Sequence, residues 1–64
     1  MTGTVKFFKQ DTGYGFITVD DDNSELFVHA SQCSGQTLKK GQKVEFSIGE
    51  GKKGDEAKEV RIIG

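Results

Sequence analysis

The sequence lacks proline and tryptophan and has a single cysteine and a single histidine. Cys33 therefore has no partner for an internal disulfide, and with His29 it offers too few ligands for a zinc site, which takes four. Because proline is absent, the nine glycines must shape the turns. We expect no metal and no disulfide, so the hydrophobic core has to stabilise the fold.

Long apolar runs and an excess of charge of one sign are also missing. No run approaches the roughly 18 residues that would cross a membrane, and no charged-then-apolar leader precedes the first turn, so we expect a cytoplasmic protein that does not contact membranes. Nine Lys or Arg against ten Asp or Glu give a net charge of −1. This balance excludes a histone-like protein that binds nucleic acid through bulk positive charge. The 64 residues, 33% of them hydrophobic, predict one domain over residues 1–64.

Apolar residues recur at every second position, which is typical of β-strands. We expect strands at residues 3–9, 14–19, 26–29, 43–48 and around 60–62. No segment has apolar residues at three-and-four spacing over three turns, so no long helix is expected. Polar or glycine-containing turns are expected at 10–13, 20–24 and 49–55, and the connection at 30–42 is too long for a hairpin. The predicted fold class is all-β: a small five-stranded antiparallel barrel.

Two of these strands carry rings where polar groups would be expected. One face holds Ile17, Val19, Leu26 and Val28, and the other holds Tyr14, Phe16, Phe27 and His29. Antiparallel pairing would gather the second set into one patch, and such an exposed patch usually marks a binding surface. In the alternative, the rings form the core, but then a second layer must cover the aliphatic face, and none is predicted.

Flat rings with a few lysines, and no strong positive field, suit stacking on unpaired bases. Duplex DNA hides its base faces, and a basic recognition helix is absent. We therefore expect single-stranded nucleic acid as the partner. The main alternative is a protein- or peptide-interaction module that uses the same patch.

Residues 12–19 follow the ribonucleoprotein pattern of a basic residue, Gly, an aromatic, Gly, Phe and an aliphatic, with Thr12 at the basic position and Val19 at an aromatic one. The chain resembles the cold-shock domain family over essentially its whole length. The resemblance rests on residues 3–8 (Gly-Thr-Val-Lys-Phe-Phe), 13–17 (Gly-Tyr-Gly-Phe-Ile), 26–29 (Leu-Phe-Val-His) and 41–46 (Gly-Gln-Lys-Val-Glu-Phe), and on Leu38, Gly54 and Ala57. It implies a five-stranded oligonucleotide-binding barrel and an ATP-independent chaperone of single-stranded RNA and DNA.

The chain also departs from the family pattern. The family usually has Trp in place of Phe7 and Lys in place of Thr12, and often an aromatic in place of Ala30 and another within the loop 33–37, which is shortened here. These changes remove ring area and one positive charge. We therefore expect this chain to bind fewer bases, or to bind them less tightly.

Phe7 and Phe8 are adjacent, so they cannot both face inward. Strict alternation groups Phe7 with Val5 in the core, whereas the resemblance places Phe7 on the binding face, which requires a bend or bulge; Phe8 then lies at the edge of the patch. The rings expected to stack on bases are Phe7, Tyr14, Phe16, Phe27 and His29, and Phe8 is expected to contact the nucleic acid from the edge of the patch or from partly inside it. Lys6 and Lys53 are expected to contact phosphates, and Glu25 to accept a hydrogen bond from a base edge.

Other constellations predict no chemistry. The pair His29 and Cys33 has no acidic residue in motif context to orient it as a catalytic pair. The acidic run 20–25 lacks the glycine and the final glutamate of a calcium loop, since Glu25 and Ser31 stand at those positions. We expect no catalysis, no metal and no cofactor. We expect a monomer, with a strand-swapped dimer as the alternative.

Overall fold

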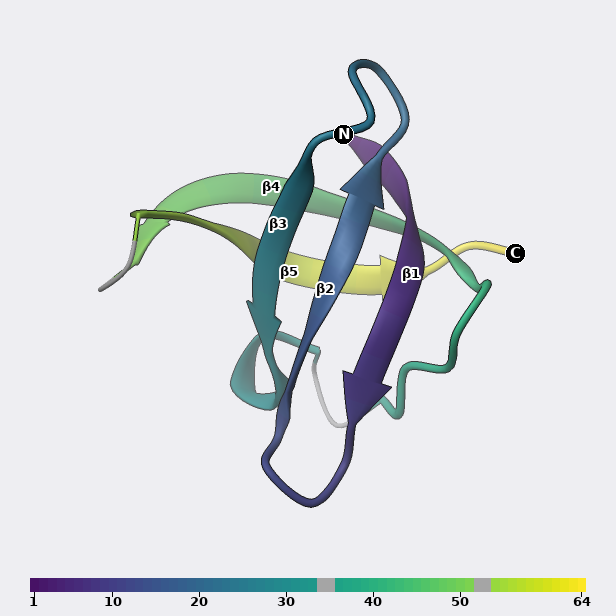
Figure 1. Ribbon diagram of the computed structural model, residues 1–64, viewed down its shortest axis with the longest axis vertical. Helices are drawn as coiled ribbons and strands as arrows, with labels where there is room; N and C mark the ends of the chain where they lie inside the picture. Colours follow the sequence, from purple (N-terminus) through teal and green to yellow (C-terminus); the bar gives the residue numbers. More distant parts are fainter. Residues whose placement is uncertain (34–35, 52–53) are drawn as a thin grey trace.

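Five strands make up most of the chain in the computed structural model, which describes residues 1–33, 36–51 and 54–64. They are β1 (Thr2–Lys9), β2 (Tyr14–Val19), β3 (Glu25–His29), β4 (Lys43–Gly51) and β5 (Gly54–Ile62) (Figure 1). A short 3-10 turn, η1 (Ala30–Gln32), begins the crossover from β3 to β4. The expected phosphate contact Lys53 lies outside the described residues.

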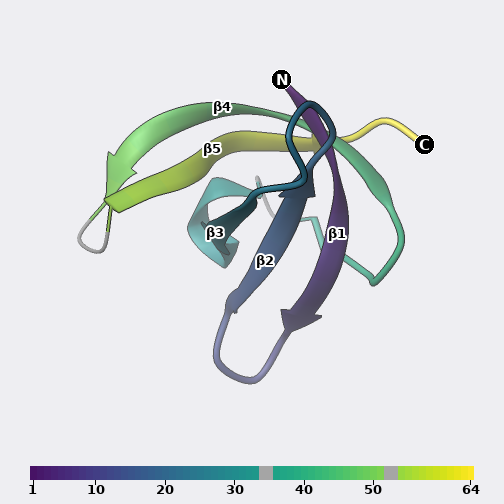
Figure 2. The ribbon, with the colours of Figure 1, turned by 45° about the horizontal axis from the view of Figure 1, so that its top comes forward.

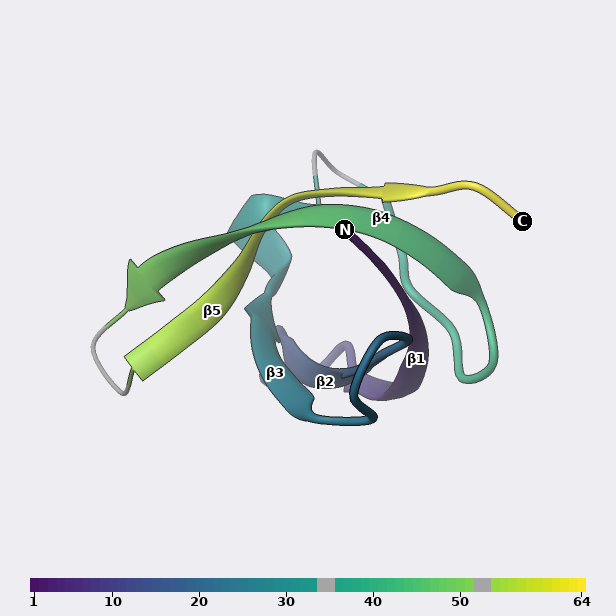
Figure 3. The same ribbon diagram turned by 90° about the horizontal axis from the view of Figure 1, so that it is seen from above.

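The strands close into a barrel in the order β1-β2-β3-β5-β4, with β4 pairing back to β1. Figure 3 shows the strands curving around one enclosed interior. The expected five-stranded barrel is confirmed, but it is not antiparallel throughout, because β3 and β5 pair in parallel. The reason is parity: in a closed ring of five strands, alternating directions cannot meet without one parallel pair.

The β4–β5 hairpin is longer than the sequence predicts. Residues 49–51 and 54–55, expected as a loop, are strand, and Glu50 pairs with Asp55 at the end of the ladder. Glycines are typical of loops, but the glycines of this stretch are part of the β4–β5 ladder and pair across it. The hairpin consequently reaches beyond the barrel (Figure 2).

The aliphatic face of β2 and β3 forms the barrel interior. Ile17 and Val28 are fully buried, Val19 and Leu26 nearly so, while Tyr14, Phe16 and Phe27 are half-buried on the outside. The interpretation in which the rings form the core is therefore wrong. The core comprises Val5, Ile17, Val19, Leu26, Val28, Cys33, Leu38, Val44, Phe46, Ala57 and Val60.

The bulge expected in β1 is present. Val5 pairs with Ile17 and Phe7 pairs with Phe16, so Lys6 is an extra residue on β1. The extra residue reverses the alternation: Val5 is buried and Lys6 is exposed, yet Phe7 reaches the outer face. Phe8 turns inward and packs against the core.

Candidate nucleic-acid interface

Four rings from the first three strands contact one another on the outer face of the barrel. We call them the aromatic cluster: Phe7, Tyr14, Phe16 and Phe27. The centroid of the Phe16 ring lies 5.4 Å from that of Phe7 and 5.9 Å from that of Phe27. The centroid of the Tyr14 ring lies 5.8 Å from that of Phe27 and 6.4 Å from that of Phe7. The strand pairing explains this, because Phe7, Phe16 and Phe27 occupy one row across β1, β2 and β3. The structure thus brings together four of the five rings expected to stack on bases.

Gly15 permits β1 and β2 to approach closely next to the cluster. A Cβ atom at this position would overlap the backbone oxygen of Phe7 and come within 2.8 Å of the Phe8 Cα. Such contacts are shorter than real Cβ atoms make, so one strand would have to move. Gly15 therefore holds Phe7 and Phe16 in register, and its role is packing rather than contact with a ligand.

His29 extends the ring surface at the end of β3, where it pairs with Tyr14. Its Nδ1 accepts a hydrogen bond from the Ser31 backbone N–H at 3.1 Å and lies 3.0 Å from the Ser31 hydroxyl. Since Nδ1 is an acceptor here, the neutral ring carries its proton on Nε2. The exposed imidazole then offers one donor in a fixed orientation.

Cys33 does not pair with the imidazole. Its thiol donates to the backbone carbonyl of His29 at 3.6 Å, and burial raises the pKa of the Cys33 thiol. A nucleophilic cysteine needs the opposite change, a lowered pKa. Cys33 instead fills part of the core.

Lys6 and Glu25 form an ion pair on the surface of β1 and β3. The Lys6 Nζ lies 2.7 Å from the Glu25 Oε2, and each side chain is about half exposed. Exposed ion pairs stabilise a fold by little, about 0–1 kcal/mol. Either partner can therefore exchange the other for a ligand group at small cost. Phe8, which was expected at the edge of the ring patch, packs against the core and makes none of the ring contacts of the aromatic cluster given above.

The acidic turn after β2 is engaged in its own hydrogen bonds. Asp22 accepts from the Ser24 hydroxyl and backbone N–H, and both bonds lower the pKa of its carboxyl. Lys43 and Thr2 donate to Asp20 and lower its pKa in the same way. Within residues 1–33, 36–51 and 54–64, no group of three or more His, Cys, Asp or Glu side chains could hold a metal ion. No helix in this part of the chain is long and apolar enough to span a membrane.

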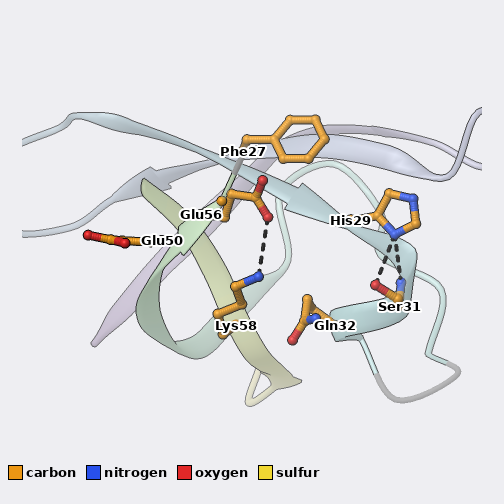
Figure 4. Close-up of a pocket in the computed structure, with 8 residues that line it drawn as sticks. Phe27, His29, Ser31, Gln32, Glu50, Glu56 and Lys58 are labelled. Carbon is orange, nitrogen blue, oxygen red and sulfur yellow. Dashed lines mark hydrogen bonds and ion pairs between the residues drawn. The ribbon is translucent and has the colours of Figure 1, made fainter. Parts of the chain in front are cut away.

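Sequence reasoning missed a second surface next to the cluster. A cleft of about 790 Å³ opens beside Phe27 and His29, between η1 and the β4–β5 hairpin (Figure 4). Its hairpin side carries Glu56 and Lys58. We did not predict it because residues 49–55 were expected to be a loop. The sequence feature that could have predicted this surface is the spacing of Glu56 and Lys58 on either side of Ala57, because in a strand this spacing places both side chains on the outer face.

The sequence and the fold match known proteins along nearly the whole chain. The profile of the 'Cold-shock' DNA-binding domain family matches residues 1–63. A cold shock-like protein of Aquifex aeolicus is 55% identical over 65 residues, covering 97% of this chain and 93% of that protein. The cold shock-like protein CspG of Escherichia coli K12 is 48% identical over 63 residues, covering 94% and 90%.

A solved structure shares the architecture at much lower identity. The chain superposes on drosophila Unr CSD456 with a TM-score of 0.79 at 20% identity, over 98% of this chain and 26% of that longer chain. This likeness supports the barrel fold alone. The family profile over residues 1–63 and the identities of 55% and 48% lead to one conclusion: the chain belongs to the cold-shock DNA-binding domain family.

Proposed function

We propose that this protein binds single-stranded RNA and DNA by stacking bases on the aromatic cluster and so acts as an ATP-independent chaperone. The observation that carries the proposal is the cluster itself, four contacting rings on the outside of a barrel whose core is complete without them. The description of the family as DNA-binding and the names of the relatives as cold shock-like proteins agree with it.

The mechanism needs no chemical step. A base that leaves a weak hairpin loses stacking on its neighbours, and a ring of the cluster replaces that stacking. Because the protein binds the open strand and not the paired one, it shifts the equilibrium toward the open strand by mass action. We propose no catalysis and no cofactor for this activity.

The few cations near the cluster support recognition through bases rather than through phosphates. The net charge of the chain is −1, and Lys6 is already paired with Glu25. Each phosphate contact on a single strand lowers the logarithm of the binding constant by only about 0.7 per tenfold increase in salt. Binding should therefore depend weakly on salt, with a slope that corresponds to one or two phosphates.

Tyrosine fluorescence tests the proposal directly. Tyr14 is the only tyrosine and there is no tryptophan, so the emission reports on the aromatic cluster itself. Heptathymidine should quench the emission and saturate, and a matched duplex long enough to stay paired at the temperature of the assay should not. Equal binding of duplex and single strand would refute base stacking, and a steep salt slope would move the site to the lysine-containing loops. Quenching by peptides but not by heptathymidine would support a protein-interaction module instead.

A further inference from the structure

The cleft beside the aromatic cluster has the features of a base-binding subsite. It is lined by Phe27, His29, Ser31, Gln32, Glu50, Gly51, Glu56 and Lys58. Phe27 belongs to both surfaces, so a strand that stacks on the aromatic cluster can continue into the cleft (Figure 4). Phe27 also pairs with Glu56 across β3 and β5, which places a carboxylate directly beside a ring.

Glu56 and Lys58 project from the same face of β5 and lie across β4. A Cβ atom at Gly51 would overlap the Glu56 carboxylate, and one at Gly49 would overlap the Lys58 side chain. The two glycines therefore leave the space in which these side chains lie. They also hold them in place, as the exposed fractions of only 14% for Glu56 and 31% for Lys58 indicate.

The Lys58 ammonium donates a long hydrogen bond to the Glu56 carboxylate. The Lys58 Nζ is 3.4 Å from the Glu56 Oε2, whereas ammonium–carboxylate hydrogen bonds are usually about 2.7–2.9 Å long. Both groups therefore keep capacity for a ligand. Among the lining residues that the structure describes, Glu50 and Glu56 outnumber Lys58, so a phosphate is disfavoured next to them. A neutral base is the part of a nucleotide that fits.

The hydrogen-bonding groups of Glu56 and Lys58 are complementary to the donors and acceptor of one base edge. The Watson–Crick edge of guanine presents an acceptor (O6) followed by two donors (N1–H and N2–H), whereas adenine, cytosine and uracil each present only one donor nitrogen there. A carboxylate accepts two parallel hydrogen bonds, and an ammonium only donates. We propose that the cleft is a guanine-selective subsite, in which Glu56 accepts from N1–H and N2–H, Lys58 donates to O6, and Phe27 stacks on the ring. This inference rests on the proposed binding of single strands and specifies one position of the bound strand.

The experiment scans one guanine through heptathymidine and measures the dissociation constant at each position. One position should bind more tightly than thymine by about fivefold or more, the lower end of what a good bidentate contact discriminates. Inosine at that position should lose the gain, since it lacks only the N2 amino group and keeps the shape and stacking surface of guanine. If heptathymidine does not bind at all, the proposed function is wrong. If it binds and no position prefers guanine over inosine, only the subsite is wrong.

Three variants connect the preference to the cleft. Glu56→Gln keeps the size of the side chain and removes the second acceptor, and Lys58→Met removes the donor to O6. Glu56→Gln should bring the ratio of guanine to inosine affinities close to one, whatever happens to overall affinity. Lys58→Met should weaken guanine and inosine alike and leave their ratio unchanged, because both bases carry O6. Glu59→Gln removes an equal charge from an exposed position outside the cleft and should leave the ratio unchanged. A melting curve of each variant confirms that it is folded. A preference for guanine over inosine that survives in folded Glu56→Gln, or an unchanged affinity for guanine in folded Lys58→Met, would refute the assignment.

Discussion

Replacing Phe16 by alanine should separate binding from folding. Its ring is the middle one of the row across β1, β2 and β3, with centroids 5.4 Å from Phe7 and 5.9 Å from Phe27, and it is half-buried. Loss of one stacked base costs about 1–3 kcal/mol, which corresponds to between about 5-fold and 150-fold in Kd. We expect a loss in this range for heptathymidine.

The cost to the fold should be smaller than for a core residue. Phe16→Ala removes two aromatic contacts, worth about 0.5–1.5 kcal/mol each, whereas truncating a core phenylalanine costs about 3–5 kcal/mol. A domain this small is stable by only about 3–5 kcal/mol, so the difference decides whether it stays folded. The variant should therefore melt at a lower temperature but remain folded at 25 °C.

Ile17→Val is the matched control, because Ile17 is the next residue of β2 and points into the barrel with no exposed surface. Deleting one buried methylene costs about 0.5–1.5 kcal/mol, which overlaps only the lower part of the roughly 1–3 kcal/mol that two lost aromatic contacts cost in Phe16→Ala. The control should lower the melting temperature and leave the Kd of the folded protein unchanged. The assay is a titration by tyrosine fluorescence beside a thermal melt. The reasoning fails if Phe16→Ala lowers stability but leaves Kd intact.

Three more changes follow from the structure. Phe7→Trp should tighten binding of both four-base and seven-base strands in the same titration, because the larger ring stays among the other rings of the cluster; an unchanged Kd for both would contradict this. Ala30 is exposed at the start of η1, so Ala30→Phe should tighten binding of the seven-base strand only, without lowering the melting temperature; lower stability with unchanged affinity would show that position 30 is no part of the site. The hydrogen bonds from Lys43 and Thr2 hold the pKa of Asp20 below its ordinary value of 3.8, so their contribution to stability is present above that value and is lost as the pH falls below it. Asp20→Asn should therefore flatten the decrease in melting temperature below about pH 4, and an unchanged acid profile would contradict the argument.

Strands β2 and β3 could be predicted from the sequence, because the alternation of aliphatic and aromatic residues along them is a local pattern. Ile17 follows Phe16, and Val28 lies between Phe27 and His29. A strand of period two fixes the face of each residue without knowledge of the neighbouring strands. The family resemblance added the outward position of Phe7. Alternation alone could not predict the outward position of Phe7, because that position depends on the extra residue Lys6 and on the close approach of β1 to Gly15.

Features that depend on distant pairing were missed. Alternation from Val44 and Phe46 would also bury Ile48, but 46% of its surface is exposed, because the register shifts between Glu45 and Ser47. The length of the hairpin and the cleft at Glu56 likewise depend on which strands meet. The residues of the glycine-containing stretch 49–55 have low strand propensity, so their composition does not indicate that β4 and β5 pair there.

Strand β5 has its two neighbours, β3 and β4, before it in the sequence. During synthesis, the first three strands emerge as a meander that already carries the whole aromatic cluster, while its aliphatic face with Ile17 and Val28 has nothing to cover it. Those side chains lose contact with water only when β4 and β5 arrive, since contacts between residues far apart in sequence form late. A chain that stops before Gly54 leaves the free edges of β3 and β4 open to pairing with other chains. The ribosome must therefore release almost the entire polypeptide before this barrel can protect its interior, and stalled synthesis near the end should yield aggregates rather than a weaker binder.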